Sequence, residues 1–207
     1  AHVVEFCGAK PVFADVRLED GNIDVSEVER LITPRTKAVT CVHFLGVPCA
    51  MEELSKLCDE HGITLVEDCA LAVSSSYRGR KVGGFGLGGC FSFYPIKHIT
   101  TGEGGMLTTN DSDFADLASK LRAFGIDRSI VDRKVPGIYD VKYADNNYRM
   151  TEIGAAIGLV QLEKLPGMLE KRRDNAAKLR EMLSEVDCLR LFEEVPGDLE
   201  TSHYCFS

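Results

Sequence analysis

Short apolar runs alternate with helix-length amphipathic stretches in the first third of the chain, and this alternation limits the fold more than any other feature. Residues 11–16, 37–44 and 63–68 read as strands, and residues 24–32 and 50–62 between them read as helices. Consecutive parallel strands need a long crossover connection, which is usually a helix, whereas antiparallel strands need only a tight turn. The alternation therefore predicts an α/β fold with a mainly parallel sheet and argues against an all-β fold.

The rest of the chain begins with a glycine-rich stretch and ends in helices. Residues 77–89, "YRGRKVGGFGLGG", hold six glycines in thirteen residues, which predicts a loop or a tight hairpin. Pro166 divides a long helical pattern into two predicted helices, because proline has no N–H group for a helix interior. The further predicted elements are strands at 90–95 and 104–110, helices at 111–125, 151–165 and 167–186, and an irregular segment at 126–149.

Composition bounds the class of protein. The 207 residues, 44% of them hydrophobic, suffice for one large α/β domain, or for one domain and part of another. The formal net charge of -8 disfavours nucleic acid and anionic membrane surfaces as partners. The printed residues show no signal-peptide pattern and no apolar run near the roughly 18 residues of a membrane span, so nothing in them suggests export or a membrane span. The eight cysteines show no C-x-x-C spacing, so we expect no metal site and a reducing, cytoplasmic location.

Lys97 lies between an aromatic run and a glycine turn, in "CFSFYPIKHITTGEGG". An arbitrary lysine after a strand is usually a solvated surface cation. Here the glycines that follow allow the backbone to wrap closely around a ligand, and Ser92, Thr100 and Thr101 supply hydroxyl groups. A partly desolvated lysine in such a place can attack a carbonyl group as the free amine.

Asp68 ends an apolar strand in "LVEDCA". Ligands of parallel sheets collect at the carboxyl ends of the strands, and a carboxylate held there can pair with a protonated ring nitrogen. Taken alone, Asp68 is equally well explained as a cap of the next segment. Together with Lys97, it indicates a site for a cofactor that has an aldehyde and a ring nitrogen.

Five stretches complete this pattern: "VEDCA", "YRGRKVGGFG", "FSFYPIKHITTGEGGMLTTND", "VHFLGVPCAMEEL" and "NNYRMTEIGAAIGLVQLEKL". Together they resemble the DegT/DnrJ/EryC1/StrS aminotransferases, pyridoxal phosphate enzymes that aminate nucleotide-linked keto sugars. The resemblance implies the three-layer large domain of the fold type I transferases over residues 1–165. It implies a linking helix and the start of a small C-terminal domain over residues 166–207.

The resemblance also implies roles for individual residues. Lys97 matches the lysine that bonds covalently to the cofactor and then moves a proton, and Asp68 matches the carboxylate that keeps the pyridine nitrogen protonated. Ser92 matches a phosphate ligand. Asn147 or Arg149 matches a region that reaches the cofactor phosphate of a neighbouring subunit, which implies a homodimer with shared active sites. The implied substrates are glutamate and a nucleotide-linked keto sugar.

Some residues depart from the family pattern or permit two interpretations. Leu71 stands where the family usually has Gln or His beside the cofactor, which removes a hydrogen bond worth about 1 kcal/mol. His98 follows the lysine directly and is expected to be structural, because adjacent residues of an extended segment point in opposite directions. His43 fits either a position near the active site or a hydrogen-bonded core. Gly154 and Gly158 indicate close helix packing.

The ends of the sequence read as incomplete elements: "AHVVEFCGA" resembles the end of a helix, and "TSHYCFS" resembles the start of a strand. We therefore expect a fragment that, by itself, is inactive or nearly so. A second hypothesis remains beside the aminotransferase, namely a non-catalytic partial domain that retains the fold. A dinucleotide-binding or P-loop protein is disfavoured, because neither glycine motif follows a strand and opens a helix.

Overall fold

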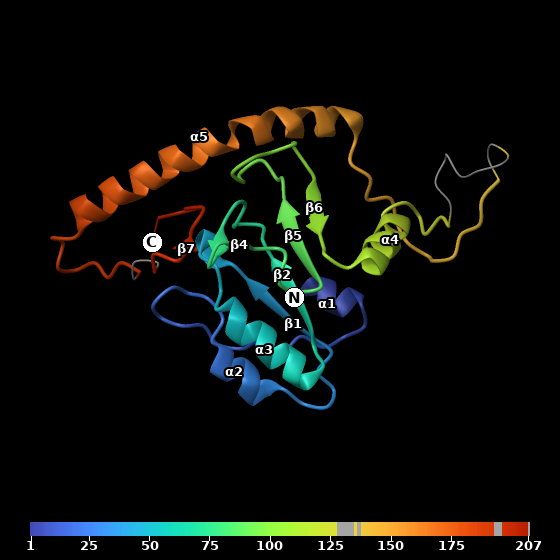
Figure 1. The fold of residues 1–207 in the computed structure, drawn as a ribbon, viewed down its shortest axis with the longest axis horizontal. Helices are drawn as coiled ribbons and strands as arrows, with labels where there is room; N and C mark the ends of the chain where they lie inside the picture. The colour runs from blue at the N-terminus through green and yellow to red at the C-terminus, as the bar shows by residue number, and fades with distance from the viewer. Residues whose placement is uncertain (128–134, 136–137, 193–195, 207) are drawn as a thin grey trace.

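A four-stranded sheet forms the centre of the fold (Figure 1). The computed structural model describes residues 1–127, 135, 138–192 and 196–206. The strands lie in the order β1, β2, β5, β6; the first three are parallel, and β6 is antiparallel to β5. The predicted α/β fold with a mainly parallel sheet is therefore confirmed. The strands are β1 (Ala38–Val42), β2 (Thr64–Asp68), β5 (Gly88–Ser92) and β6 (Gly105–Thr108).

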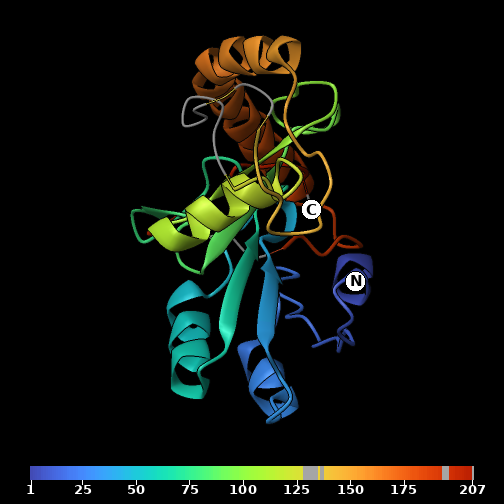
Figure 2. The ribbon, with the colours of Figure 1, turned by 90° about the vertical axis from the view of Figure 1, so that its right-hand side faces the viewer.

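Two helices, α2 (Val25–Leu31) and α3 (Met51–His61), bury one face of this sheet. Alternate residues of β1, Val39 and Cys41, point into this core, as the two-residue period of a strand requires. Gly62 ends α3 in the left-handed conformation, with a φ of 62°. Figure 2 shows the N-terminal segment with α1 (His2–Phe6) on the opposite side of the sheet from α3. The sheet therefore lies between two layers.

A small second sheet is built on the glycine-rich stretch. Strands β3 (Ser76–Tyr77) and β4 (Arg80–Lys81) form the tight hairpin that the glycines predict. Strand β7 (Leu199–Glu200) pairs with β3 in antiparallel fashion. This pairing returns the C-terminal segment to the body of the molecule, beside the short 3-10 turn η1 (Phe44–Gly46).

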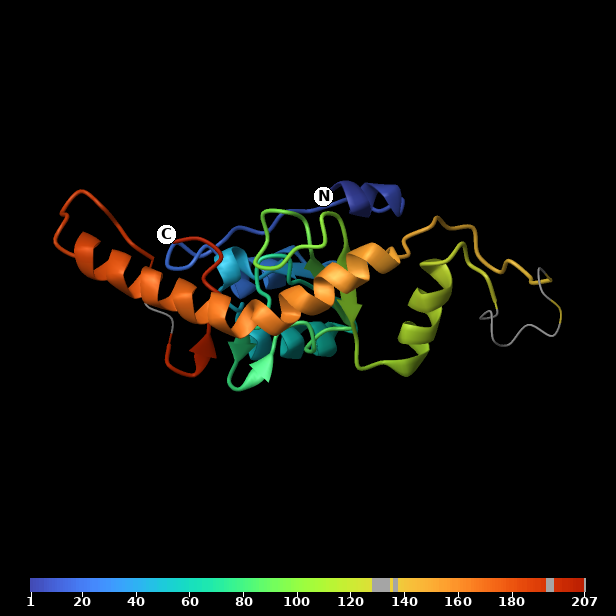
Figure 3. The same cartoon turned by 90° about the horizontal axis from the view of Figure 1, so that it is seen from above.

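Helix α5 (Glu152–Leu183) crosses the molecule above the carboxyl ends of the strands, as Figures 1 and 3 show. Thr151 caps it, since its side chain accepts a hydrogen bond from the Gly154 N–H at 3.1 Å. Leu165 is buried in a cluster with Phe93 and Ile99, so the helix packs directly on the segment that contains Lys97. The remaining helix is α4 (Ser112–Leu121), which follows β6.

Close packing of α5 explains its glycines. A Cβ added at Gly158 would lie 3.1 Å from Thr101 Cγ2, a tighter contact than side chains usually accept. Gly158 and Gly154 thus allow the helix to approach the lysine-bearing turn, as the sequence predicts. In the described part of the chain, no helix combines the length and the apolar character that a membrane span requires.

Three predicted elements are wrong. Residues 11–16 form no strand, only an isolated bridge from Val16 to Ile23, because no strand edge pairs with them. Pro166 does not divide the helix: α5 continues through it, since proline fits the helical φ and the packing of Leu165 holds the turn. The final strand lies at Leu199–Glu200 and not within residues 201–206. Part of the predicted irregular segment, residues 128–134 and 136–137, lies outside the described residues. The predicted domain division at residue 165 stays a prediction.

Candidate active site

Asp68 and Ser92 lie at the carboxyl ends of neighbouring strands. Asp68 is the last residue of β2 and pairs in register with Cys90 of β5, and Ser92 is the last residue of β5. Since residues two apart share a face, Ser92 lies on the same face of the sheet as Cys90 and Asp68. This face is opposite the one that packs on α3, because Glu67, the neighbour of Asp68, is fully buried on the core side.

Lys97 lies in the turn that follows β5. The turn is held at both sides of Phe93, whose N–H donates to the Gly104 carbonyl at 2.9 Å and whose carbonyl accepts the Thr101 N–H at 3.0 Å. Phe93 itself is buried under α5. Lys97 is half-buried, and its N–H donates to the Tyr94 carbonyl at 3.0 Å. The glycines after the lysine therefore close a rigid turn, as the sequence suggests.

Each of these three residues has a polar group whose bonding capacity is not fully used by the described residues. Asp68 Oδ1 accepts the Ala70 N–H at 3.0 Å, while Oδ2 accepts no hydrogen bond within the described part of the chain. Ser92 Oγ accepts the Tyr94 N–H at 3.3 Å, which leaves its hydroxyl proton to donate. Among the described residues, no carboxylate forms an ion pair with Lys97. An acceptor, a donor and an amine of this kind fit the ring nitrogen, phosphate and aldehyde of pyridoxal phosphate.

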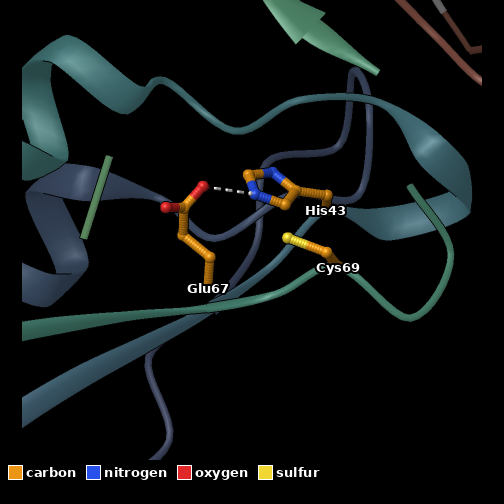
Figure 4. A group of neighbouring side chains, drawn as sticks. All are labelled: His43, Glu67 and Cys69. Carbon is orange, nitrogen blue, oxygen red and sulfur yellow. Dashed lines mark hydrogen bonds and ion pairs between the residues drawn. The ribbon is translucent and has the colours of Figure 1, made fainter. Parts of the chain in front are cut away.

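A buried cluster of His43, Glu67 and Cys69 lies beneath this edge (Figure 4). Glu67 Oε2 accepts from His43 Nε2 at 3.2 Å and from the Gly83 N–H at 2.7 Å. Oε1 accepts the N–H groups of Phe85 and Gly86, at 2.7 and 2.8 Å. The carboxylate thereby fixes the glycine-rich loop that leads into β5.

The electrostatics of this cluster favour a structural role. Burial raises the pKa of Glu67, but the bonds from His43 and from three backbone N–H groups outweigh it, so the pKa is lowered overall. His43 Nδ1 accepts the Cys49 N–H at 3.1 Å, so the ring carries its proton on Nε2 and donates it to Glu67. Burial raises the pKa of the Cys69 thiol. His43 is therefore the hydrogen-bonded core histidine of the two interpretations that the sequence permits.

His98 and Leu71 both contact the C-terminal segment. His98 is 6% exposed, and its Nε2 donates to the Ser202 carbonyl at 2.9 Å, which agrees with the structural role expected for it. The Leu71 carbonyl accepts the Ser202 hydroxyl at 2.9 Å. Leu71 is half-buried and brings no polar side chain to the site. Ser202 thus joins the two segments that flank Asp68 and Lys97 in the sequence.

Asn147 and Arg149 are not joined to this site. Asn147 Oδ1 accepts both the N–H and the Nε–H of Arg149, at 3.2 and 3.0 Å, and both side chains are exposed. The Arg149 guanidinium lies over the Phe124 ring, 5.4 Å from its centroid. No hydrogen bond or ion pair connects either residue to Asp68 or Lys97 in the described part of the chain.

Two residues at the site are absent from the sequence-based prediction. Glu67 has a signal in the sequence: strand alternation places it in the core when Asp68 faces the other way, and a buried carboxylate needs several donors. Tyr204 has none. Its ring lies 5.2 Å from Lys97 Nζ, although 107 positions separate the two residues in the chain.

Comparisons with known proteins give the same family as the sequence motifs. A model of the DegT/DnrJ/EryC1/StrS aminotransferase family matches residues 1–206. The chain is 44% identical over 172 residues to the GDP-perosamine synthase of Caulobacter vibrioides, a match that covers 83% of this chain and 44% of that protein. The structure of Helicobacter pylori PseC, an aminotransferase involved in the biosynthesis of pseudoaminic acid, matches with a TM-score of 0.92 and 34% identity. That match covers 100% of this chain and 54% of PseC.

A third relative is S. venezuelae DesV, whose structure is described as a complex with ketimine intermediate. It matches with a TM-score of 0.89 and 33% identity over 99% of this chain and 53% of DesV. The chain thus spans about half the length of these relatives. The family model covers nearly all of its residues, and the structural likeness extends over the whole described fold. The chain belongs to the DegT/DnrJ/EryC1/StrS aminotransferase family.

Proposed function

We propose that the protein containing this chain transfers an amino group, with pyridoxal phosphate as cofactor, from glutamate to a nucleotide-linked keto sugar. The observation that carries the proposal is the set of unused polar groups on Asp68, Ser92 and Lys97 at the carboxyl edge of the sheet. Ligands of parallel sheets bind at this edge. Membership of an aminotransferase family supplies the reaction class.

Asp68 and Ser92 bind and orient the cofactor. Pyridoxal phosphate, when bound, supplies an aldehyde and a ring that accepts electrons from the carbon where protons are exchanged. Asp68 Oδ2 pairs with the protonated ring nitrogen and keeps that proton in place. The Ser92 hydroxyl donates a hydrogen bond to a phosphate oxygen.

Lys97 provides the reactive amine. Its Nζ would hold the cofactor through the aldehyde group, and as a free amine it would take a proton from the donor Cα and return it on the other side of the transfer. The hydrogen-bonded turn around Phe93 holds the backbone of Lys97, so its side chain starts from a fixed position. Helix α5 packs on this turn through Leu165, which contacts Phe93 and Ile99.

The names of two relatives support a nucleotide-linked sugar as the acceptor of the amino group. A GDP-perosamine synthase and PseC are both named for amino-sugar products or pathways, which favours a nucleotide-linked sugar as the acceptor. Glutamate is the usual donor in the family. The cytoplasm, where such soluble substrates are made, agrees with eight cysteines that are all free.

A homodimer with shared sites accounts for Asn147 and Arg149. Both are exposed, and among the described residues neither is bonded to Asp68 or Lys97, so they are available to the phosphate of a neighbouring subunit. The first turns of α5 also expose large apolar side chains, with Ile153 at 76% and Leu159 at 65% exposure, which marks a contact surface. Sedimentation that finds an active monomer would contradict the shared site.

The test is to find the lysine that bonds to the cofactor. Borohydride reduction of the full-length protein with bound cofactor, followed by peptide mapping, should place the pyridoxyl group on Lys97. Lys81 is the matched control, because it lies in the neighbouring hairpin and already bonds to the Ser74 carbonyl and to Glu200. A label on Lys81 would refute the assignment.

The second hypothesis, a non-catalytic domain that retains the fold, predicts a different result. It expects no pyridoxyl label on any lysine and no change in absorbance when pyridoxal phosphate is added. The catalytic hypothesis uses the free capacity of Asp68 and Ser92 to bind the cofactor, whereas the structural hypothesis gives these two groups no role.

A further inference from the structure

The C-terminal segment 199–204 is tied to distant parts of the chain. Its β7 residues pair with β3, and the Ser202 N–H donates to the Ser75 hydroxyl at 3.1 Å. The Tyr204 N–H donates to the Leu45 carbonyl at 3.0 Å, and Arg172 of α5 donates to the Tyr204 carbonyl at 3.0 Å. Backbone bonds on both sides of residue 204 therefore fix the direction of its side chain.

The side chain of Tyr204 meets the amine of Lys97. Nζ lies 5.2 Å from the ring centroid, within the distance of about 6 Å at which an ammonium group is attracted by a ring face. This is the only contact of the Lys97 ammonium group with a charged or aromatic partner among the described residues. Tyr204 is half-buried, so water only partly screens the attraction.

His98 supports the ring of Tyr204 from another side. The two ring centroids are 5.5 Å apart, with the planes tilted by 55°. His98 is held in turn by the Ser202 carbonyl, so the same segment fixes both rings. Burial lowers the pKa of His98 to about 4, which keeps it neutral near pH 7, and it does not compete with Lys97 as a cation.

We propose that Tyr204 is a positioning residue for the reactive lysine: once the released amine of Lys97 has taken up a proton, the ring holds the resulting ammonium group at the carboxyl edge of the sheet. The proposal rests on the proposed function of Lys97. The interaction is a contact between a cation and an aromatic ring, so the aromatic ring of Tyr204, and not its hydroxyl group, positions the lysine. The segment 199–204, far from the lysine in the sequence, thereby completes the lysine's surroundings.

The geometry is tested without turnover. Lysines of the cofactor-free, full-length protein are dimethylated with ¹³C-formaldehyde and a mild reductant, and Lys97→Arg identifies the Lys97 signal by its loss. A methylated ammonium group above a ring face retains the attraction. The Lys97 methyl signal should be shifted upfield by the ring current in the wild type and in Tyr204→Phe, and should lose that shift in Tyr204→Leu. An identical signal in the wild type and Tyr204→Leu overturns the proposal.

The functional effect is tested by steady-state kinetics. Tyr204→Leu should lower kcat by about five- to tenfold, the value of a partly desolvated cation–ring contact, and leave KM for the keto sugar within about twofold. Tyr204→Phe should restore kcat, because it retains the ring. Phe206→Leu is the matched control: it removes an aromatic ring two residues after Tyr204, and should leave kcat unchanged. If Tyr204→Phe is as impaired as Tyr204→Leu, the ring is not the active feature and the proposal is wrong.

Failure of this proposal is distinguishable from failure of the proposed function. If borohydride labels a lysine other than Lys97 in the wild type, the assignment of Lys97 fails whatever the methyl signals show. If Lys97 is labelled and its methyl signal does not depend on Tyr204, the role of Tyr204 alone fails. Folding of each variant is checked by its unfolding midpoint, and a variant that does not fold is replaced by Tyr204→Met, which keeps apolar volume without a ring.

Discussion

Replacing Glu67 by glutamine should lower the stability of the fold without changing Asp68, Ser92 or Lys97. Glu67 is fully buried, and its two oxygens accept four hydrogen bonds from His43 and from the loop residues Gly83, Phe85 and Gly86. Gln has the same shape but only one acceptor oxygen. The substitution therefore changes hydrogen bonding with almost no change in volume.

The expected loss in the free energy of unfolding follows from the two orientations that the glutamine amide can take. If its NH₂ group replaces Oε1, it faces the donors of Phe85 and Gly86; if it replaces Oε2, it faces Gly83 and His43. His43 has no way to adapt, because its Nδ1 is occupied by the Cys49 N–H. Two bonds to a charged acceptor are lost either way, at about 1.5 to 3 kcal/mol each, so we expect a loss of about 3 to 6 kcal/mol. This loss is a large share of the total stability of a domain, which is about 5 to 15 kcal/mol.

The assay is urea unfolding followed by circular dichroism, with the free energy of unfolding extrapolated to water. Glu60→Gln is the control: Glu60 is exposed on α3, its ion pair with Lys56 spans 3.8 Å, and such pairs contribute less than about 1 kcal/mol. A Glu67→Gln protein whose free energy of unfolding falls by no more than that of Glu60→Gln would refute the reasoning. The carboxylate would then not be what holds the glycine-rich loop.

Further predictions concern pH, the proline in α5, the carboxylate of Asp68 and metal ions. Burial lowers the pKa of His98 from 6.5 to about 4, so its contribution to stability is complete above pH 6.5 and is lost as the pH falls towards 4; His98→Gln should flatten this part of the stability profile. Pro166→Ala should raise the free energy of unfolding by about 1 to 3 kcal/mol, since it restores an N–H inside α5, and an unchanged urea midpoint would contradict this. Asp68→Asn should abolish the half-reaction with glutamate while cofactor binding partly survives in absorbance titrations. Removing divalent ions with EDTA should leave the melting temperature unchanged, because both oxygens of Glu67 already accept hydrogen bonds. A lower melting temperature would show that a metal ion binds to the cluster of His43, Glu67 and Cys69.

The sequence alone predicts those features that depend on local order. The alternation of apolar runs and amphipathic stretches predicts the parallel strands β1 and β2 and helices α2 and α3, because crossover connections have a characteristic length. The glycine content of residues 77–89 predicts the β3–β4 hairpin for the same local reason. Asp68 and Lys97 stand out because a strand end and a glycine turn are both readable from neighbouring residues.

Pairing partners and burial were decided only by the tertiary structure. Residues 11–16 have the composition of a strand, yet a strand forms only where its backbone pairs with another, and no strand of the described sheet pairs with them. Pro166 lies inside a continuous helix, because the packing of Leu165 compensates for a local defect that sequence rules treat as a break. Hydrogen-bond partners such as those of Glu67 are set by which loop passes beneath it. The contact between Tyr204 and Lys97 depends on the return of β7 to β3, and chain separation of that size leaves no periodic pattern that a sequence could display.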